Sequence, residues 1–366
     1  MDSDVILVIV VATALAFDFT NGFHDTANAV ATTVSTRAMS PRSAVALAAV
    51  LNFAGAFISL EVAATIASGI VEAEAINEMI VFGGLIGAIA WNLITWYFGL
   101  PSSSSHALIG GVAGAALAAK GPDVVLGDGL VEKVLIPALV APLLAFGAAA
   151  LAILVAYRVV GRLRPGPVNR GYRLGQIVSG SLFSLAHGTN DAQKTMGIIA
   201  LALVAHGDLG AGEDPPFWVI VSAATAIALG TYSGGWRIMK TMGSRIIKMD
   251  PAQGFSAQGG GAAVILTATH LGFPLSTTHT ISGAVMGAGA ARRLSAVRWG
   301  VAGNIFLAWI LTVPCAAAIG GLAYGASRVF GEGALGPVLV SLCVLTFIAG
   351  AFARRLQRGP ALTAEA

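Results

Sequence analysis

Long apolar segments recur from one end of this chain to the other, and they constrain its fold more than any other feature. A helix needs about 20 mainly apolar residues to cross a bilayer. Of the 366 residues, 56% are hydrophobic and only 11% are charged, whereas a soluble protein carries about 25% charged residues. The mean hydropathy is +0.81. The sequence therefore predicts an all-α polytopic membrane protein with about 10–12 transmembrane segments. The apolar segments are 5–19, 43–60, 79–98, 103–118, 134–158, 175–206, 217–233, 259–273, 275–290, 300–325 and 335–352.

The connections between these segments separate by charge. Cytoplasmic connections of membrane proteins carry an excess of Lys and Arg, so the pattern predicts an outside N-terminus and a cytoplasmic C-terminus. The net charge of +3 is too small and too dispersed to indicate nucleic-acid binding. The basic connections are 37–42, 157–173, 237–248, 291–298 and 354–358, and the acidic or neutral ones are 1–4, 61–78, 123–132 and 208–214.

Two spaced motifs occur twice in the same order, which indicates an internal repeat. "GFHD" at 22–25 matches "GTND" at 188–191, and "GLPSSSSHALIG" at 99–110 matches "GFPLSTTHTISG" at 272–283. By the charge rule, the polar stretches of the two copies cross the membrane in opposite directions. Inverted repeats of this kind are typical of secondary transporters, whose site lies near the midplane. The predicted parts are a first repeat (1–160), a basic linker (161–174), a second repeat (175–353) and a cytoplasmic tail (354–366).

The two Pro-Ser motifs, "PSSSSH" and "PLSTTH", have the composition of helix starts. Proline is tolerated in the first turn of a helix, and Ser and Thr are favoured at its cap. A helix start offers free backbone N–H groups to an anion. Two such starts facing one another would suit a tetrahedral oxyanion. The alternative is that these hydroxyls bond only to backbone carbonyls or hold helices together.

Carboxylates within apolar segments are the next candidates, because charges in the hydrocarbon region are costly and usually functional. Asp25 and Asp191 occupy equivalent repeat positions, whereas Asp18 and Glu61 have no counterpart. Lys194 follows Asp191 by one helical turn, so a purely structural ion pair is the alternative reading of that motif.

Three histidines and two cysteines are further side chains of the types that hold ligands. His106 and His279 close the two Ser/Thr motifs, where they either bond the substrate or orient the loop. His187 and Asp191 are two potential metal ligands, which is too few to predict a metal site. Cys315 and Cys343 lie in apolar segments without metal-ligand spacing, and we interpret them as small hydrophobes.

From about residue 5 to 350 the chain resembles the inorganic phosphate transporter (PiT) family, and within it the bacterial low-affinity phosphate transporters. "GFHDTANA", "GTNDAQKT", "PSSSSH" and "PLSTTH" stand where the family has its duplicated signature and paired Ser/Thr segments. The resemblance implies an inverted-repeat homodimer with broken helices at the signatures and re-entrant helical hairpins. By position it assigns phosphate contacts to Ser103, Ser104, Ser105, Ser276, Thr277 and Thr278, and places Asp25, Asn28, Asn190 and Asp191 at the anion and coupling-ion sites.

The chain departs from the sodium-coupled pattern of this family at two positions. His24 replaces an Asn, and Lys194 replaces the second Asn, the counterpart of Asn28. A lysine ammonium can occupy the space of a sodium ion and neutralise Asp191. Together with a titratable histidine, this favours proton coupling, with sodium coupling as the alternative. In bacterial relatives the transported species can also be a neutral metal–phosphate complex.

Other functions fit the sequence less well than phosphate transport. Sulfate is the alternative substrate, although it has no hydrogen to donate to Asp25 or Asp191. An intramembrane hydrolase is disfavoured because the Ser/Thr runs are duplicated and lack a nucleophile-elbow motif. A passive anion channel or a receptor fits the duplicated polar motifs less well. The sequence indicates no enzyme activity and no cofactor.

Overall fold

The structure is a computed structural model, and it describes residues 2–68 and 76–357. The regular elements in these ranges are helices, as the sequence predicts. Part of the acidic connection at 61–78 and most of the predicted tail, from residue 358 on, lie outside the described residues. The helices are α1 (Asp2–Ser35), α2 (Pro41–Gly55), α3 (Glu61–Ser68), α4 (Glu78–Phe98), α5 (Ser104–Lys120), η2 (Pro122–Val124), α6 (Gly127–Leu130), η3 (Val131–Leu135), α7 (Ile136–Val160), α8 (Pro165–His206), α9 (Phe217–Ser233), α10 (Trp236–Lys240), η4 (Thr241–Arg245), α11 (Pro251–His270), α12 (Thr277–Ala290), η5 (Leu294–Ala296), α13 (Trp299–Arg328) and α14 (Leu335–Gln357).

The two signature stretches lie in the middle of long helices, α1 and α8, that are continuous through them. This corrects the expectation of broken helices at the signatures. The polar side chains there find partners on neighbouring helices, so the backbone need not unwind to supply them. The breaks lie at other places: α9 and the helix after it are bent by 58° at a short break, and the Pro motifs separate α4 from α5 and α11 from α12.

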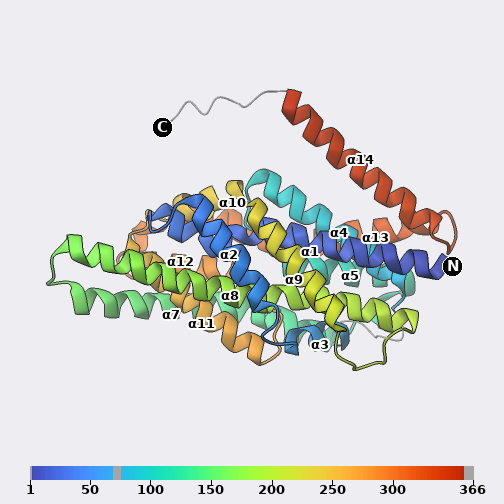
Figure 1. Cartoon of the computed structure of the whole chain (residues 1–366), viewed down its shortest axis with the longest axis horizontal. Coiled ribbons are helices and arrows are strands. Elements are labelled where there is room, and N and C mark those ends of the chain that lie inside the picture. The colour runs from blue at the N-terminus through green and yellow to red at the C-terminus, as the bar shows by residue number, and fades with distance from the viewer. Residues whose placement is uncertain (1, 69–75, 358–366) are drawn as a thin grey trace.

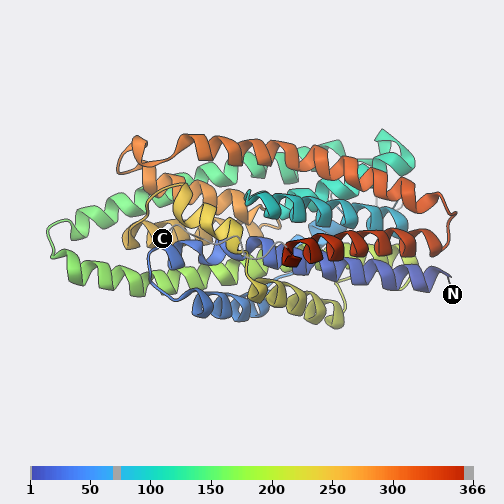
Figure 2. The same ribbon diagram turned by 90° about the horizontal axis from the view of Figure 1, so that it is seen from above.

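Helices from the two halves of the chain pack reciprocally. The first signature helix, α1, packs on α9, and the second, α8, packs on α2. In the same way α13 packs on the α4–α5 hairpin, and α7 packs on the α11–α12 hairpin. Figures 1 and 2 show the resulting interlocked bundle, with α14 leaning away from it in Figure 1. Each half therefore completes the packing of the other, and neither hairpin is covered by its own half alone.

Equivalent glycines allow the two crossings between the halves to be close. A Cβ added at Gly22 would lie 2.2 Å from the Ile227 carbonyl oxygen of α9, and one at Gly188 would lie 2.2 Å from the Asn52 carbonyl oxygen of α2. Real Cβ atoms do not approach a backbone oxygen so closely, so only glycine fits. Small residues are the usual means of bringing membrane helices together. The two crossings are therefore built in the same way.

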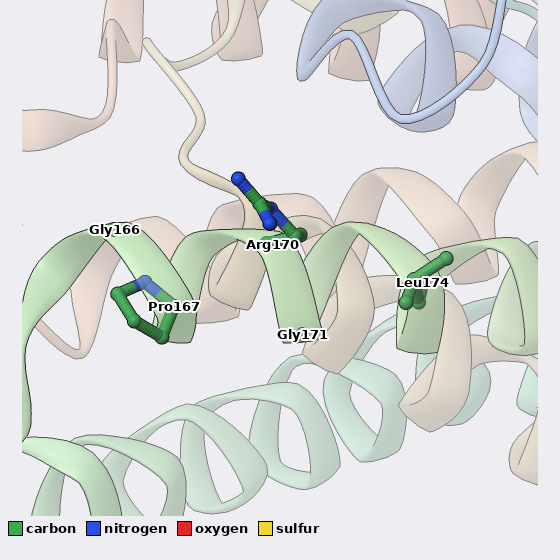
Figure 3. A pocket seen from close by; sticks show the side chains of 5 residues that line it. All are labelled: Gly166, Pro167, Arg170, Gly171 and Leu174. Atoms are coloured by element: carbon green, nitrogen blue, oxygen red, sulfur yellow. The ribbon is translucent and has the colours of Figure 1, made fainter.

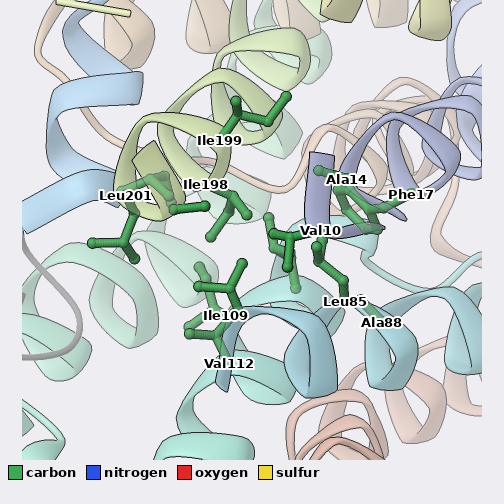
Figure 4. Close-up of a cluster of buried hydrophobic side chains, with 14 of the residues drawn as sticks. Val10, Ala14, Phe17, Leu85, Ala88, Ile109, Val112, Ile198, Ile199 and Leu201 are labelled. Atoms are coloured by element: carbon green, nitrogen blue, oxygen red, sulfur yellow. The ribbon is translucent and has the colours of Figure 1, made fainter. Parts of the chain in front are cut away.

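Two hydrophobic cores lie on either side of the polar residues. The first core includes residues 10–17 of α1 and 198–203 of α8, together with parts of α4 and α5 (Figure 4). The second core includes residues 27–31 of α1 and Phe183 of α8. Along α1 the first core comes first, whereas along α8 it comes second. The two signature helices thus run in opposite directions, which is the arrangement that inverted repeats require.

The acidic and basic connections meet at opposite ends of the bundle. At one end His206 contacts Glu78 and Asp4. Figure 1 shows the N-terminus and the α8–α9 connection at this end and the basic α7–α8 connection at the other. In another basic connection the Arg298 guanidinium donates to the carbonyl oxygens of Ser244 and Arg245. This segregation agrees with the charge pattern of the sequence. Which end faces the cytoplasm stays a prediction of the positive-inside rule.

Four of the described helices are long and apolar enough to cross a membrane, or five if the bent pair after residue 216 counts as one span. Three of the others, α2, α5 and α12, have only 15, 17 and 14 residues. The second signature helix, α8, is long but carries buried polar and charged side chains. The chain is thus a multi-pass membrane protein, and the larger span count stays a prediction.

Candidate functional site

Asp25, on α1, is held by hydrogen bonds from three sides. His24 Nδ1 lies 2.6 Å from its Oδ1 atom. The Ser104 hydroxyl, at the start of α5, donates to Oδ2 at 3.2 Å, and the Thr278 hydroxyl, at the start of α12, donates to Oδ1 at 3.3 Å. The carboxylate is buried. Asp25 therefore lies where the tips of the two hairpins meet, the tips being the Pro motifs between α4 and α5 and between α11 and α12 together with the helix starts that follow them.

Asp191, on α8, is held mainly by charge. The ammonium of Lys194, one turn along the helix, donates to its Oδ1 atom, and His187 Nε2 lies 3.1 Å from Oδ2. The Thr277 hydroxyl donates to Oδ2 at 3.2 Å. The same ammonium donates to the Leu275 carbonyl at 2.8 Å. The Asp191–Lys194 pair predicted from the sequence is thus present, fully buried, and tied to the second hairpin.

The two Ser/Thr motifs are helix starts, as predicted. Ser103 and Ser276 are the N-caps of α5 and α12, and their hydroxyl oxygens accept from the backbone N–H of His106 and His279. The prolines lie before the caps and not in the first turn. Pro101 and Pro274 each lie inside a tight turn. The Ser102 N–H donates to the Leu100 carbonyl, and the Leu275 N–H donates to the Phe273 carbonyl, both at 2.9 Å. Such turns are common where a loop begins.

The two hairpin tips face one another. The Ser105 hydroxyl donates to the Leu275 carbonyl at 3.1 Å, and the rings of His106 and His279 lie 4.7 Å apart. The Thr278 hydroxyl also accepts from the Asn28 amide at 2.8 Å. Free N–H groups of two helix starts and several hydroxyls therefore converge beside two carboxylates.

The remaining candidate residues lie around this centre. The Asn190 amide donates to the Thr269 hydroxyl at 2.7 Å and to the Phe273 carbonyl at 3.3 Å. It therefore holds the end of α11 and the loop that follows it. His279 stacks on Trp309 of α13, whose indole N–H donates to the Pro101 carbonyl. These contacts favour the orienting role for His106 and His279 over direct contact with substrate.

Several supporting residues carry no sequence signal. Thr95 contacts His24 Nε2 at 3.1 Å, and Ser102 donates to Thr95 at 2.8 Å. Asn52 contacts His187 Nδ1 at 3.2 Å and donates to the Thr231 hydroxyl at 2.7 Å. Single polar residues in apolar segments do not stand out in one sequence, and packing alone brings them to the site.

A third potential metal ligand joins the pair recognised in the sequence. Asp25, His187 and Asp191 each place one ligand atom within 4.8 Å of the others, and all three are buried. The Lys194 ammonium already pairs with Asp191, so one cation of the protein itself lies at this cluster. A shallow hollow lined by Gly166, Pro167, Arg170, Gly171 and Leu174 (Figure 3) lies about 30 Å away along α8.

Comparisons with known proteins show which proteins this chain is similar to. A model of the phosphate transporter family matches residues 21–168 and 162–320. A probable low-affinity inorganic phosphate transporter of Mycobacterium bovis is 51% identical over 97% of this chain and 85% of that protein. Its namesake in Rhizobium meliloti is also 51% identical, over 88% of this chain and 96% of that protein.

A solved structure titled the sodium-dependent phosphate transporter superposes with a TM-score of 0.79 at 27% identity, covering 88% of this chain and 99% of that one. With the family match over most of the sequence and relatives at half identity, this chain belongs to the phosphate transporter family.

Proposed function

We propose that this chain imports inorganic phosphate across the bacterial inner membrane by symport with protons, in an alternating-access cycle around a midplane site. One observation carries the proposal: two helix starts rich in hydroxyls meet at a pair of equivalent buried carboxylates. Helix starts attract anions, and the relatives that match most of the chain are named phosphate transporters.

Phosphate would bind between the two hairpin tips. The hydroxyls of Ser103, Ser104, Ser105, Ser276, Thr277 and Thr278 and the amides of Asn28 and Asn190 are the proposed contacts. Ser103 and Ser276 keep their own hydroxyl hydrogens for donation, because as caps they only accept. Asp25 can accept a hydrogen bond from a protonated phosphate oxygen. Sulfate cannot supply that hydrogen, which favours phosphate over sulfate.

The coupling ion is the second part of the proposal. A dianion beside carboxylates is repelled unless a cation or proton binds as well, and such linkage is reciprocal. Lys194 occupies the position of a free cation at Asp191, and His24 contacts Asp25. This arrangement supports protons over sodium ions. A divalent metal carried with phosphate would reduce the repulsion too, and Asp25, His187 and Asp191 offer it ligands.

The assembly and orientation follow from the family and the charge pattern. We propose two inverted repeats, 1–160 and 175–353, joined by the basic linker 161–174, with the N-terminus outside and the C-terminus cytoplasmic. The antiparallel signature helices support this division. The homodimer is inferred from the family resemblance, and its interface would lie among membrane lipids.

Sodium coupling is the alternative favoured by a specific finding, the likeness to a sodium-dependent phosphate transporter. Uptake of labelled phosphate into proteoliposomes, with a proton gradient and a sodium gradient applied separately, tests the proposal. We expect accumulation with the proton gradient alone and no competition by sulfate. Accumulation that needs sodium would contradict proton coupling, and uptake without saturation would indicate a channel.

A further inference from the structure

Asp18 is a buried carboxylate that the proposed site does not use. Its side chain is 0% exposed, and both of its oxygens lack a hydrogen-bond partner among the described residues. Asp25 and Asp191, in contrast, each have a histidine and at least one hydroxyl within hydrogen-bond distance. An isolated charge is costly to bury in a membrane protein. Asp18 is therefore either neutral or matched by a mobile cation.

Two polar side chains, one from each signature helix, lie beside Asp18. Thr195 of α8 and Asn21 of α1 interact with the carboxyl. The Thr195 hydroxyl and the Asn21 amide oxygen have no hydrogen-bond partner in the described part of the chain. A carboxylate and an amide oxygen are both acceptors, so they cannot bond to each other. A proton on Asp18 would let one carboxyl oxygen donate to the Asn21 amide oxygen, while the Thr195 hydroxyl donates to the other carboxyl oxygen.

The position of Asp18 links it to the proposed phosphate site. Asp18, Asn21 and Asp25 are spaced by three and seven residues, so they share one face of α1. Asp18 lies about 10 Å from Asp25 along the helix, toward the N-terminus. The charged groups that act on it are Asp191 and Lys194 of α8. Of the other helices that pack most extensively on α1, α9 carries no charged residue and α4 carries only Glu78, at its first position. The charged residues of α2, α10 and η4 are basic: Arg42, Arg237, Lys240 and Arg245.

The position equivalent to Asp18 in the second repeat carries a different residue. When Asp25 is aligned with Asp191, the counterpart of Asp18 is Ser184. The Ser184 hydroxyl donates to the Gly180 carbonyl of its own helix, so that position is satisfied without any ligand. Among these equivalent positions only the α1 side has a group that can take up and release a proton.

We propose that Asp18 binds the proton that is transported with phosphate. The proton forms an O–H bond with the carboxylate when the site is open to the outside, and that bond breaks when the site opens to the cytoplasm. Binding it removes one negative charge from the region that receives the anion, and phosphate and proton therefore strengthen each other's binding. The inference rests on the proposed function, and it assigns the coupling step to a residue outside the phosphate contacts.

The test compares Asp18→Asn with the wild-type protein in proteoliposomes. The matched control is Glu61→Gln, which neutralises an exposed carboxylate at the start of α3. Proton-driven accumulation of labelled phosphate should fall about tenfold or more in Asp18→Asn, its uptake should lose its pH dependence, and phosphate–phosphate exchange should persist. Glu61→Gln should behave as the wild type. Unchanged proton-driven accumulation in Asp18→Asn would overturn the assignment.

Infrared difference spectroscopy tests the assignment of the proton to Asp18 even if the Asp18→Asn variant transports no phosphate. The carboxylic C=O band of a buried protonated carboxyl should be present in the wild-type protein and absent in the variant. A band that persists in Asp18→Asn would overturn the proposal. Failure of the proposed function is distinguishable, because the wild-type protein itself would then show no proton-driven accumulation. A wild-type band that shifts with the sodium concentration and not with pH would also contradict the assignment.

Discussion

The two signature helices hold equivalent carboxylates by different means. On α1, Asp25 is bound by a histidine and by hydroxyls from both hairpin tips. On α8, Asp191 is bound by a lysine ammonium in addition to a histidine, with a hydroxyl only from its own hairpin. The scaffold around them is nevertheless matched, since Ser104 and Thr277 each donate to their own repeat's carboxylate at 3.2 Å. A symmetric framework therefore carries an asymmetric charge pattern.

This difference assigns different tasks to the two carboxylates. A buried ion pair is strongly disturbed when one partner is removed, because the other charge is left uncompensated. Asp191 thus serves first to hold Lys194, and through it the Leu275 carbonyl of the second hairpin. Asp25 has no permanent cation among its hydrogen-bond partners, and it remains available to a ligand that arrives between the tips.

The largest expected effect comes from removing Asp191. Asp191→Asn leaves the Lys194 ammonium buried without its counter-ion, which costs about 3–5 kcal/mol of unfolding free energy. Asp25→Asn, the matched control, leaves no such charge and should destabilise the protein less. Thermal unfolding of both variants in detergent, with labelled-phosphate uptake, checks this. Equal destabilisation by the two substitutions would show that the carboxylates are equivalent.

The matched framework predicts equal effects at the two glycine crossings. Gly22→Ala and Gly188→Ala should each cost about 1–3 kcal/mol through overpacking, because both Cβ atoms would meet a backbone oxygen. Gly147→Ala on α7 is the control, since its Cβ would meet nothing within 4 Å. Unfolding measurements in detergent compare the three. A loss of unfolding free energy at only one crossing would show that the two crossings are not built in the same way.

A smaller effect is expected at the hairpin tips, and it should be unequal. Ser104→Ala removes a donor to Asp25, and the apparent affinity for phosphate should fall about tenfold, as for a lost hydrogen bond to a charged group. Thr277→Val should cost less, since Lys194 still holds Asp191. Ser222→Ala on α9, whose hydroxyl bonds only to its own helix, is the control. Uptake kinetics at several phosphate concentrations would show the order, and equal losses would contradict it.

The smallest effect concerns the acidic end of the bundle, where the two signature helices are joined. A hydrogen bond to Glu78 raises the pKa of His206, at the end of α8, above its ordinary value of 6.5, and Asp208 and Asp4 raise it further. The protonated histidine therefore stabilises the fold below pH 6.5, and this contribution disappears as the pH rises through the raised pKa.

His206→Gln should accordingly lower the melting temperature of the protein at mildly acidic pH and have little effect at alkaline pH. Melting curves of the variant and the wild-type protein at several pH values measure this difference. A loss of stability that is the same at every pH would mean that charge on His206 does not hold the two helices together.

The sequence alone predicted the elements that local chemistry determines. Ser103 and Ser276 cap helices because hydroxyls at such positions satisfy free N–H groups. Lys194 meets Asp191 because one turn of helix separates them. In both cases the partners are close along the chain, so spacing was sufficient.

The contacts that the sequence did not predict join residues far apart in the chain. The continuity of α1 through Asp25 depends on partners from α5 and α12 that no local pattern reveals. Asn52 and Thr95 reach the site only through helix packing. The start of each hairpin helix was predicted too early, at the proline, whereas Pro101 and Pro274 precede the caps Ser103 and Ser276. A proline before a cap and one in the first turn differ by only a few residues.

An experimental structure determined with bound phosphate tests the central claim most directly. The claim predicts a tetrahedral density between the starts of α5 and α12, within hydrogen-bond distance of Ser104 and Thr277 and beside Asp25. Phosphate that touches neither hairpin tip, for example in the hollow beside Arg170 (Figure 3), would contradict it.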